Sequence, residues 1–311
     1  MGAIKEYDSV YDVIVEPKKD GGTAFLLLIP KKIQNGQILM ETNNCENETL
    51  SDDFLGNVMN VADKLLCISQ HNPCPIFVPI IPSSEGRVPY FQQLSKECFL
   101  LDEKNENYRI DEQVVCSLNK AKQMIEERTH KKPADKVFLN GYSASGCFAQ
   151  RFCLVHPELV SKCVLGGSSG SIPVPTKDLC YPIGIKDFKE LTGKEFLIDE
   201  YQKIDFHYYV GELETKNKSD KRVDDFGQPA PLHDMSYMER SVPKEVGQKQ
   251  REMFGTNLFE RANKSVETLH QYGIKVEHKV LQGLTHRGIG SEVVAQPESV
   301  YNSQFKRERG L

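Results

Sequence analysis

Residues 136–146 of the chain read KVFLNGYSASG. The apolar run at the start of this stretch predicts a short buried strand over residues 136–140. Small residues then form a sharp turn around Ser143, and the apolar spacing of residues 148–155 predicts a helix directly after it. We therefore expect a strand, a tight turn that carries a serine, and a helix. This unit decides how the rest of the sequence is interpreted.

Strands and helices alternate on both sides of this unit. Further strands are predicted at 75–81, 162–167, 205–210 and 276–281, and further helices at 50–69, 111–128, 257–272 and 291–304. Such alternation predicts an α/β protein with a mostly parallel central sheet and helices on both of its faces.

The N-terminal part follows a different pattern. Two apolar runs at 11–15 and 23–33 are separated by Lys-Lys-Asp-Gly-Gly at 18–22, which is typical of a hairpin. A second turn signal, Asn35-Gly36, precedes another apolar run at 37–42. We expect these segments to form an antiparallel meander at one edge of the sheet.

Two stretches interrupt the alternation. Residues 171–203 are rich in turn signals, and residues 215–255 are long, polar and charged. Connections of this length are usually functional or mobile. Because both follow strands that end at the same edge of the sheet, we expect a single domain over residues 1–311 with two excursions that could cover a site at that edge. Their aromatic residues fit a local core or a pocket lining equally well: Tyr181, Phe188, Phe196, Phe226 and Tyr237.

The composition excludes several classes of protein. The chain has 311 residues with 39 Lys and Arg against 44 Asp and Glu, so its formal net charge is −5. Nucleic-acid binding needs clustered positive charge, so this balance argues against nucleic acid as a partner. The longest apolar run, residues 24–29, is long enough for a strand but too short to span a membrane.

Cysteine usage favours a reducing environment. The chain has nine cysteines without any Cys-x-x-Cys pair, and its first residues lack the basic and apolar regions of a secretory signal. Reduced thiols and a cytoplasmic location are therefore expected. Cys147, Cys153 and Cys163 are expected to be small buried residues close to the serine turn.

The serine turn is the first candidate for chemistry, because sites in such sheets lie at the carboxyl ends of the strands. A nucleophile elbow needs small residues two positions before and two positions after its serine. Gly141 fills the first position, while Ser145 stands at the second and is followed by Gly146. Ser143 is the favoured nucleophile, because a nucleophile at Ser145 would put Ser143 where a glycine is needed. An ordinary glycine-rich turn is the alternative.

A serine nucleophile needs a base and an acid that orients the base. Glu214 follows the strand 205–210 and His286 follows the strand 276–281, which gives the chain order serine, acid, histidine. Other acids that remain open are Glu212, Asp220, Asp224 and Asp225. Two further histidines are expected to have other roles: His278 a structural role within its strand, and His156 a place at a helix end or on the surface.

The sequence resembles the α/β-hydrolase family, in particular its serine esterases and polyester depolymerases, over residues 11–304. The resemblance rests on the turn 141–146, the strand end 210–214, the loop 283–286 and the early strand 25–30. This chain departs from the family pattern in three respects. They are Ser145 in place of glycine, a glutamate as the acid, and Glu-Thr-Asn-Asn at 41–44 in place of a His-Gly-Gly run.

The resemblance implies a serine hydrolase that acts on a small-molecule ester. Ser143 would attack the acyl carbonyl, His286 would accept its proton, and Glu214 would orient His286. The chain carries no His-Glu-x-x-His run or calcium-loop spacing, and its glycine-rich stretch 166–170 lacks the lysine of a phosphate loop. Neither a metal ion nor a cofactor is therefore expected.

The resemblance also implies an oxyanion hole. The backbone N–H of Ala144 would be one donor, and the loop around Asn43 or Asn44 would supply the second. Three other functions remain open on the same scaffold: hydrolysis of an amide or peptide, acyl transfer, and binding without catalysis.

Overall fold

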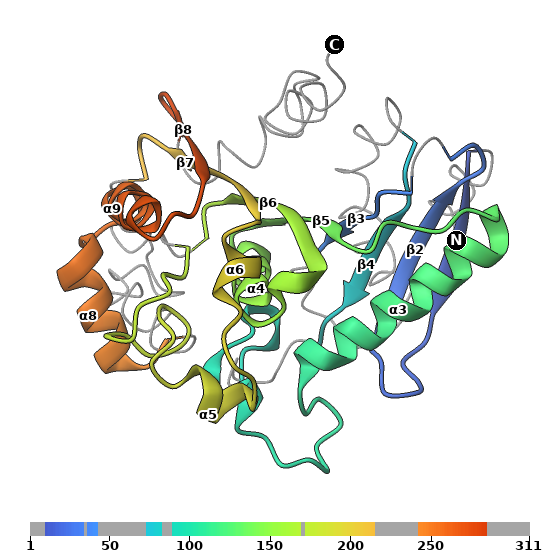
Figure 1. The fold of residues 1–311 in the computed structure, drawn as a ribbon, viewed down its shortest axis with the longest axis horizontal. Coiled ribbons are helices and arrows are strands. Elements are labelled where there is room, and N and C mark those ends of the chain that lie inside the picture. The colour runs from blue at the N-terminus through green and yellow to red at the C-terminus, as the bar shows by residue number, and fades with distance from the viewer. Residues whose placement is uncertain are drawn as a thin grey trace, which may run out of the picture.

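The computed structural model describes residues 10–33, 36–42, 73–82, 89–168, 172–214 and 242–284. They build an eight-stranded sheet in the order β1-β2-β4-β3-β5-β6-β7-β8 (Figure 1). The strands are β1 (Tyr11–Glu16), β2 (Ala24–Pro30), β3 (Leu39–Glu41), β4 (Ile76–Ile80), β5 (Val137–Tyr142), β6 (Val160–Gly166), β7 (Asp205–Gly211) and β8 (Val276–Leu281). The α-helices are α3 (Ile110–Thr129), α4 (Ala144–Val155), α5 (Phe188–Thr192), α6 (Ile198–Tyr201), α8 (Lys244–Phe254) and α9 (Leu258–Gln271).

The sheet is mostly parallel, as predicted. β1 pairs with β2 and β2 pairs with β4 in antiparallel directions, whereas β4, β3, β5, β6, β7 and β8 follow one another in parallel. The predicted antiparallel N-terminal pair is confirmed, with Tyr11 opposite Pro30 and Glu16 opposite Phe25.

The third segment of the predicted meander has a different place. β3 is parallel and lies between β4 and β5, so it is not a neighbour of β2. All three of its residues are buried, which suits a central parallel strand better than an edge hairpin. Gln37 adds a side-chain anchor, because its amide donates to the carbonyl of Lys136 at 3.0 Å. Asn35 of the predicted second turn lies outside the described residues.

One face of the sheet is covered by α3, α4 and α9 (Figure 1). The buried positions of α3 are Val114, Leu118, Ala121 and Ile125, which recur at the spacing that puts apolar side chains on one helix face. The predicted helices 111–128 and 257–272 are confirmed as α3 and α9. The opposite face also carries buried residues, including Leu26, Leu28, Ile76, Val78 and Tyr209. The predicted helices 50–69 and 291–304 lie outside the described residues.

The excursion 171–203 packs as part of the core. Tyr181 and Phe188 are buried, and a series of aromatic contacts runs from Phe188 through Phe196 and Tyr201 to Phe206 of β7, with ring centroids 5.4–5.5 Å apart. The aromatic residues of this excursion therefore form a local core. Phe226 and Tyr237 lie outside the described residues.

The sequence did not predict α8. This helix buries Val246, Gly247, Gln250 and Phe254, so only two of its buried residues are large and apolar, and they leave few apolar positions in the sequence to indicate a helix. All seven cysteines in the described part of the chain are free thiols, and Cys147, Cys153 and Cys163 are buried as predicted. Within the same residues, no helix is both long and apolar enough to cross a membrane.

Candidate active site

Ser143 lies at the junction between β5 and α4. Its backbone has φ 60° and ψ −121°, a region that a residue other than glycine adopts only under constraint. The N–H of Ser143 donates to the carbonyl of Gly166 at 2.9 Å, and the carbonyl of Ser143 accepts from Cys147 at 3.1 Å. The predicted sequence of strand, tight turn and helix is confirmed, with the serine at its most strained position.

Crowding around the turn explains its glycines. A Cβ atom on Gly141 would lie 2.6 Å from the carbonyl oxygen of Ser145, and one on Gly146 would lie 2.8 Å from Cβ of Ser168. The second position that cannot carry a side chain is therefore 146, and position 145 accepts a serine.

The side chain of Ser145 forms hydrogen bonds with the backbone of the turn. Its Oγ donates to the carbonyl of Tyr142 at 2.9 Å and accepts from the N–H of Tyr142 at 3.1 Å. Ser145 is also buried, whereas Ser143 is half-buried. Of the two serines, Ser143 is therefore the one whose hydroxyl is better suited to meet a substrate.

The end of β3 is tied to the same turn. Thr42 donates its hydroxyl to the carbonyl of Ser145 at 2.8 Å and its backbone N–H to the carbonyl of Asn140 at 3.4 Å. Beside it, the amide of Asn140 donates to the carboxylate of Glu41, and both side chains are buried. Asn43 and Asn44, the predicted sources of an oxyanion donor, lie outside the described residues.

The turns after β7 and β8 are joined by hydrogen bonds. Leu213 donates its N–H to the carbonyl of Leu284, and Glu212 donates its N–H to the carbonyl of Leu281, both at 3.0 Å. The N–H of Gly283 donates in the opposite direction to the Glu212 carboxylate at 2.9 Å. The chain segments that lead to Glu214 and to His286 therefore run side by side as far as Leu284. His286 itself lies outside the described residues.

Glu214 is a buried carboxylate at the end of this pair of turns, with 3% of its surface exposed. Its N–H donates to the carbonyl of Gly211 at 3.0 Å. Burial raises the pKa of Tyr208 well above its usual range, and the nearby charge of Glu214 raises it further, while Arg261 opposes this shift. Among the other candidate acids, Glu212 holds Gly283, and Asp220, Asp224 and Asp225 lie outside the described residues.

These groups share one edge of the sheet. β5, β6, β7 and β8 are parallel neighbours, so their carboxyl ends lie together. Ser143 and Glu214 follow strands two positions apart, which corresponds to about 10 Å across the sheet. Ala144 is the first residue of α4, and the first N–H groups of a helix have no acceptor within the helix.

Comparison with solved structures identifies this architecture. No protein-family model matches the chain, and no curated protein matches it either. Poly(aspartic acid) hydrolase-1 from Sphingomonas sp. KT-1 is similar with a TM-score of 0.54 and 14% identity, over 92% of this chain and 97% of that one. The poly(3-hydroxybutyrate) depolymerase LpqC from Bordetella parapertussis has a TM-score of 0.55 and 13% identity, over 94% and 91%. A thermostable esterase has a TM-score of 0.50 and 14% identity, over 96% of this chain and 63% of its own.

The chain has the α/β-hydrolase fold. At 13–14% identity the likeness concerns the fold alone. In the α/β-hydrolase fold, the turn between a strand and a helix can carry a strained, exposed serine, and Ser143 occupies such a turn here.

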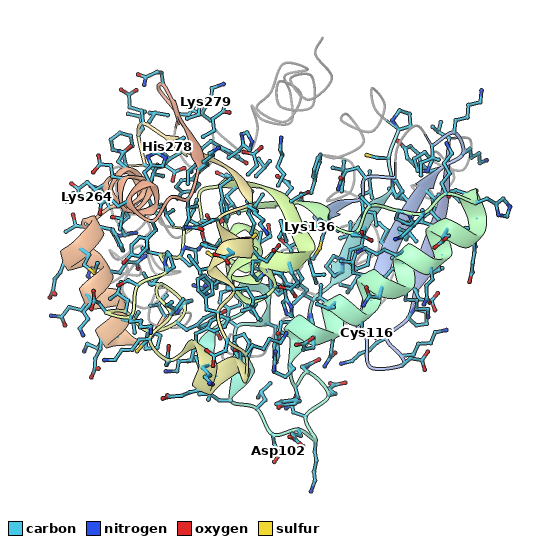
Figure 2. The ribbon with its side chains drawn as sticks, in the orientation of Figure 1. Asp102, Cys116, Lys136, Lys264, His278 and Lys279 are labelled. Atoms are coloured by element: carbon cyan, nitrogen blue, oxygen red, sulfur yellow. The ribbon has the colours of Figure 1, made fainter. Side chains whose placement is uncertain are left out.

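His278 lies within β8 of this α/β-hydrolase fold (Figure 2). Its ring stacks on Tyr208 of the neighbouring strand, with centroids 5.7 Å apart. Burial lowers the pKa of His278, and the nearby His270 lowers it further. The expected structural role of His278 agrees with this position.

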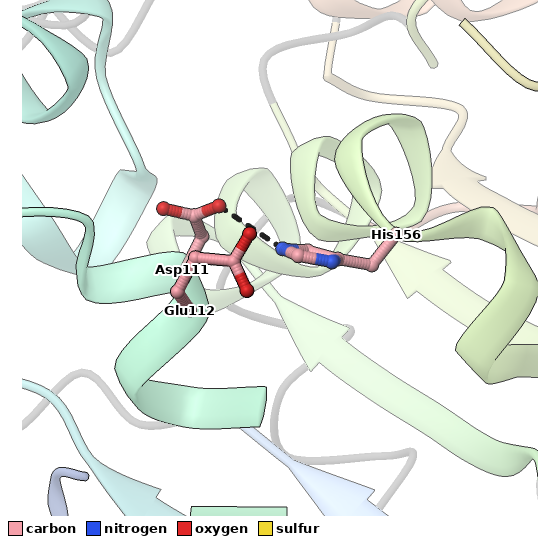
Figure 3. A group of neighbouring side chains, drawn as sticks. All are labelled: Asp111, Glu112 and His156. Carbon is pink, nitrogen blue, oxygen red and sulfur yellow. Dashed lines mark hydrogen bonds and ion pairs between the residues drawn. The ribbon is translucent and has the colours of Figure 1, made fainter. Parts of the chain in front are cut away.

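His156 ends α4 as predicted, but it is buried rather than on the surface, with 1% exposed. Its Nε2 lies 3.0 Å from Oδ2 of Asp111, and this contact offsets the cost of burying the ring (Figure 3). Arg109 binds both oxygens of Asp111 at 2.9 and 2.7 Å. Sequence reasoning missed this network because no local motif connects the first turn of α3 with the end of α4.

The same network contains a geometric candidate for a metal site. Ligand atoms of Asp111, Glu112 and His156 all lie within 4.8 Å of one another. However, Arg109 also reaches Glu112 at 3.1 Å, and Lys194 lies 2.5 Å from the same carboxylate. Two cationic side chains already balance the carboxylates, so the network is better suited to joining elements than to holding a cation.

Proposed function

We propose that the protein is a serine hydrolase that cleaves a carboxylic ester through an acyl-enzyme on Ser143. The observation that supports this most strongly is the backbone of Ser143, held at φ 60° between β5 and α4. A strained serine at this place in an α/β-hydrolase fold is the arrangement that presents a nucleophile to a substrate.

In the proposed mechanism, Oγ of Ser143 attacks the acyl carbonyl while His286 accepts its proton. The tetrahedral intermediate collapses, and the alcohol leaves with the proton from His286. Water then attacks the acyl-enzyme, again with His286 as the base, and releases the acid and free Ser143. Glu214 would orient His286 and stabilise its charged form.

The assignment of Glu214 is supported by the turns that precede it. The bond from Leu213 to Leu284 joins the residue before Glu214 to a residue two positions before His286. Glu212, the nearest rival, directs its carboxylate to Gly283.

The oxyanion would be bound by the N–H of Ala144 and by a second donor after β3. The N–H of Thr42 donates to Asn140, which supports a second donor beyond Thr42, at Asn43 or Asn44. The positive end of the α4 dipole would add to this stabilisation, because the helix begins directly after Ser143.

Ester cleavage is favoured by two of the similar structures, a poly(3-hydroxybutyrate) depolymerase and an esterase. The third, a poly(aspartic acid) hydrolase, makes hydrolysis of an amide the second candidate. Acyl transfer would use the same acyl-enzyme with an acceptor other than water.

Hydrolysis of p-nitrophenyl esters of increasing acyl length, measured beside aminoacyl anilides, tests the proposal. We expect turnover of esters by the wild type and none by Ser143→Ala. Preference for the anilides would reverse the ester assignment. Absence of turnover and of any covalent adduct would favour a binding protein on the same scaffold.

A further inference from the structure

Ser145 and Thr42 brace the serine turn from two sides. Ser145 closes its hydroxyl onto both backbone groups of Tyr142, the residue before Ser143, at 2.9 and 3.1 Å. Thr42 then donates to the carbonyl of Ser145 at 2.8 Å from the end of β3. These hydrogen bonds join the residues on either side of Ser143, and the bond from Thr42 connects them to the neighbouring strand β3.

The Ser145 side chain does more than fit the space at this position, because its hydroxyl forms hydrogen bonds with the turn. The usual residue two positions after the nucleophile is glycine, which has no side chain to bind the turn. In this chain the position that must be glycine for steric reasons is 146, because a Cβ atom added to Gly146 would lie 2.8 Å from Cβ of Ser168. Position 145 is therefore free to carry a hydroxyl, and that hydroxyl binds the residue before the proposed nucleophile.

We propose that Ser145 and Thr42 are positioning residues of the reaction, which hold Ser143 in its strained conformation. This inference rests on the proposed function of Ser143. A positive φ is unfavourable for serine, so loss of the bracing contacts lets the turn relax and moves Oγ away from its working position. Displacement of a reacting group by a fraction of an ångström or more lowers the rate of reaction.

Loss of these two hydroxyls should affect the catalytic step more than substrate binding. Both hydroxyls bind backbone atoms of the turn, so their loss should change the geometry of Ser143 without removing a group that contacts the substrate. Variants should therefore lower kcat while KM changes little.

The test compares two variants with two matched controls. Ser145→Ala and Thr42→Val remove the bracing hydroxyls. Ser265→Ala and Thr192→Val remove buried hydroxyls that donate to the helical carbonyls of Ala262 and Phe188, at 3.1 and 2.8 Å, in α9 and α5. Three quantities are measured for each protein: the rate of inactivation by a fluorophosphonate, the values of kcat and KM on a p-nitrophenyl ester, and the midpoint of thermal unfolding.

We expect the inactivation rate and kcat to fall roughly 10- to 100-fold in Ser145→Ala and Thr42→Val. The two controls should stay near the wild-type rates. Thr42→Ser, which keeps the hydroxyl, should restore most of the activity lost in Thr42→Val. Ser145→Gly, which recreates the usual pattern, should be as slow as Ser145→Ala.

Two results would overturn the inference in distinguishable ways. Wild-type inactivation rates in folded Ser145→Ala and Thr42→Val would refute the positioning role and leave the proposed function intact. Absence of labelling in the wild type would refute the proposed function, and the positioning role with it. If Ser145→Ala fails to fold, the pair Thr42→Val and Thr42→Ser gives the decision.

Discussion

Leu213 donates its backbone N–H to the carbonyl of Leu284 at 3.0 Å, and this bond joins the turn that carries Glu214 to the turn that follows β8. Residues 71 positions apart in the chain are thereby held at one edge of the sheet. In a reaction that needs an acid and a histidine to act together, such a link fixes the segments that deliver them.

The first prediction concerns Glu214. Glu214→Gln should lower kcat by roughly 10²- to 10⁴-fold, because an amide neither stabilises the charged histidine nor holds its tautomer. The near-isosteric change should leave the thermal unfolding transition cooperative. The assay is steady-state hydrolysis of a p-nitrophenyl ester.

Glu212→Gln is the matched comparison, since glutamine keeps an oxygen acceptor for the N–H of Gly283. It should retain most of the turnover. Near-normal activity in Glu214→Gln would transfer the acid role to Glu212 or to the cluster formed by Asp220, Asp224 and Asp225.

The second prediction concerns the buried pair His156 and Asp111. Burial lowers the pKa of His156, but the bonds to Asp111 and Glu158 and the charge of Asp111 together outweigh this and raise it above its usual value. For Asp111, burial raises the pKa, and the bonds from Arg109 and His156 outweigh this and hold it well below its usual range. The attraction between the charged forms therefore stabilises the folded state.

The directions of the two pKa shifts define the pH range in which this pair stabilises the folded state. The contribution of His156 is fully present below the unfolded pKa of about 6.5 and is lost as pH rises through the raised folded value. The contribution of Asp111 is present above about pH 4 and is lost as pH falls through its lowered folded value.

His156→Gln tests this window through the free energy of unfolding in denaturant. The variant should be less stable than the wild type by about 1–3 kcal/mol at about pH 6, and the difference should shrink by about pH 9. His130→Gln, at an exposed histidine, should show no such trend. A difference that is the same at both pH values would contradict the prediction.

The third prediction compares the effects of alanine substitutions at Gly141 and Gly247. Gly141→Ala would place Cβ 2.6 Å from the backbone oxygen of Ser145, so it should abolish esterase activity and destabilise the fold by more than about 1 kcal/mol. Gly247 lies inside α8, and its added Cβ would meet nothing closer than 3.8 Å.

Gly247→Ala should therefore stabilise the protein by about 0.5–1 kcal/mol and leave activity unchanged. Differential scanning calorimetry with an ester assay checks both variants. If the two variants had the same stability and the same activity, the serine turn would be less crowded than its geometry indicates.

Much of the sheet follows from local apolar runs. The strand 276–281 was predicted with the bounds that β8 has, because six residues with flanking turn signals define it. The position of β3 did not follow, because its three residues carry too little pattern to reveal which strands they join. The helix α8 was missed because half of its buried positions are Gly247 and Gln250.

The candidate site was predictable only in part. The motif at residues 141–146 indicated a tight turn between a strand and a helix, and this turn is present. The hydroxyl of Ser145 was interpreted only as a tolerated small group, because its bonds to Tyr142 depend on the folded turn. The bonds from Thr42 and Leu213 were also missed, since they join segments more than 70 residues apart and leave no local signature.

The most direct test of the central claim is fluorophosphonate labelling of the full chain followed by peptide mass spectrometry. The proposed mechanism predicts a single adduct on Ser143, absent from Ser143→Ala and retained in the control Ser265→Ala. No adduct on the wild-type protein, or an adduct that persists in Ser143→Ala, would contradict it.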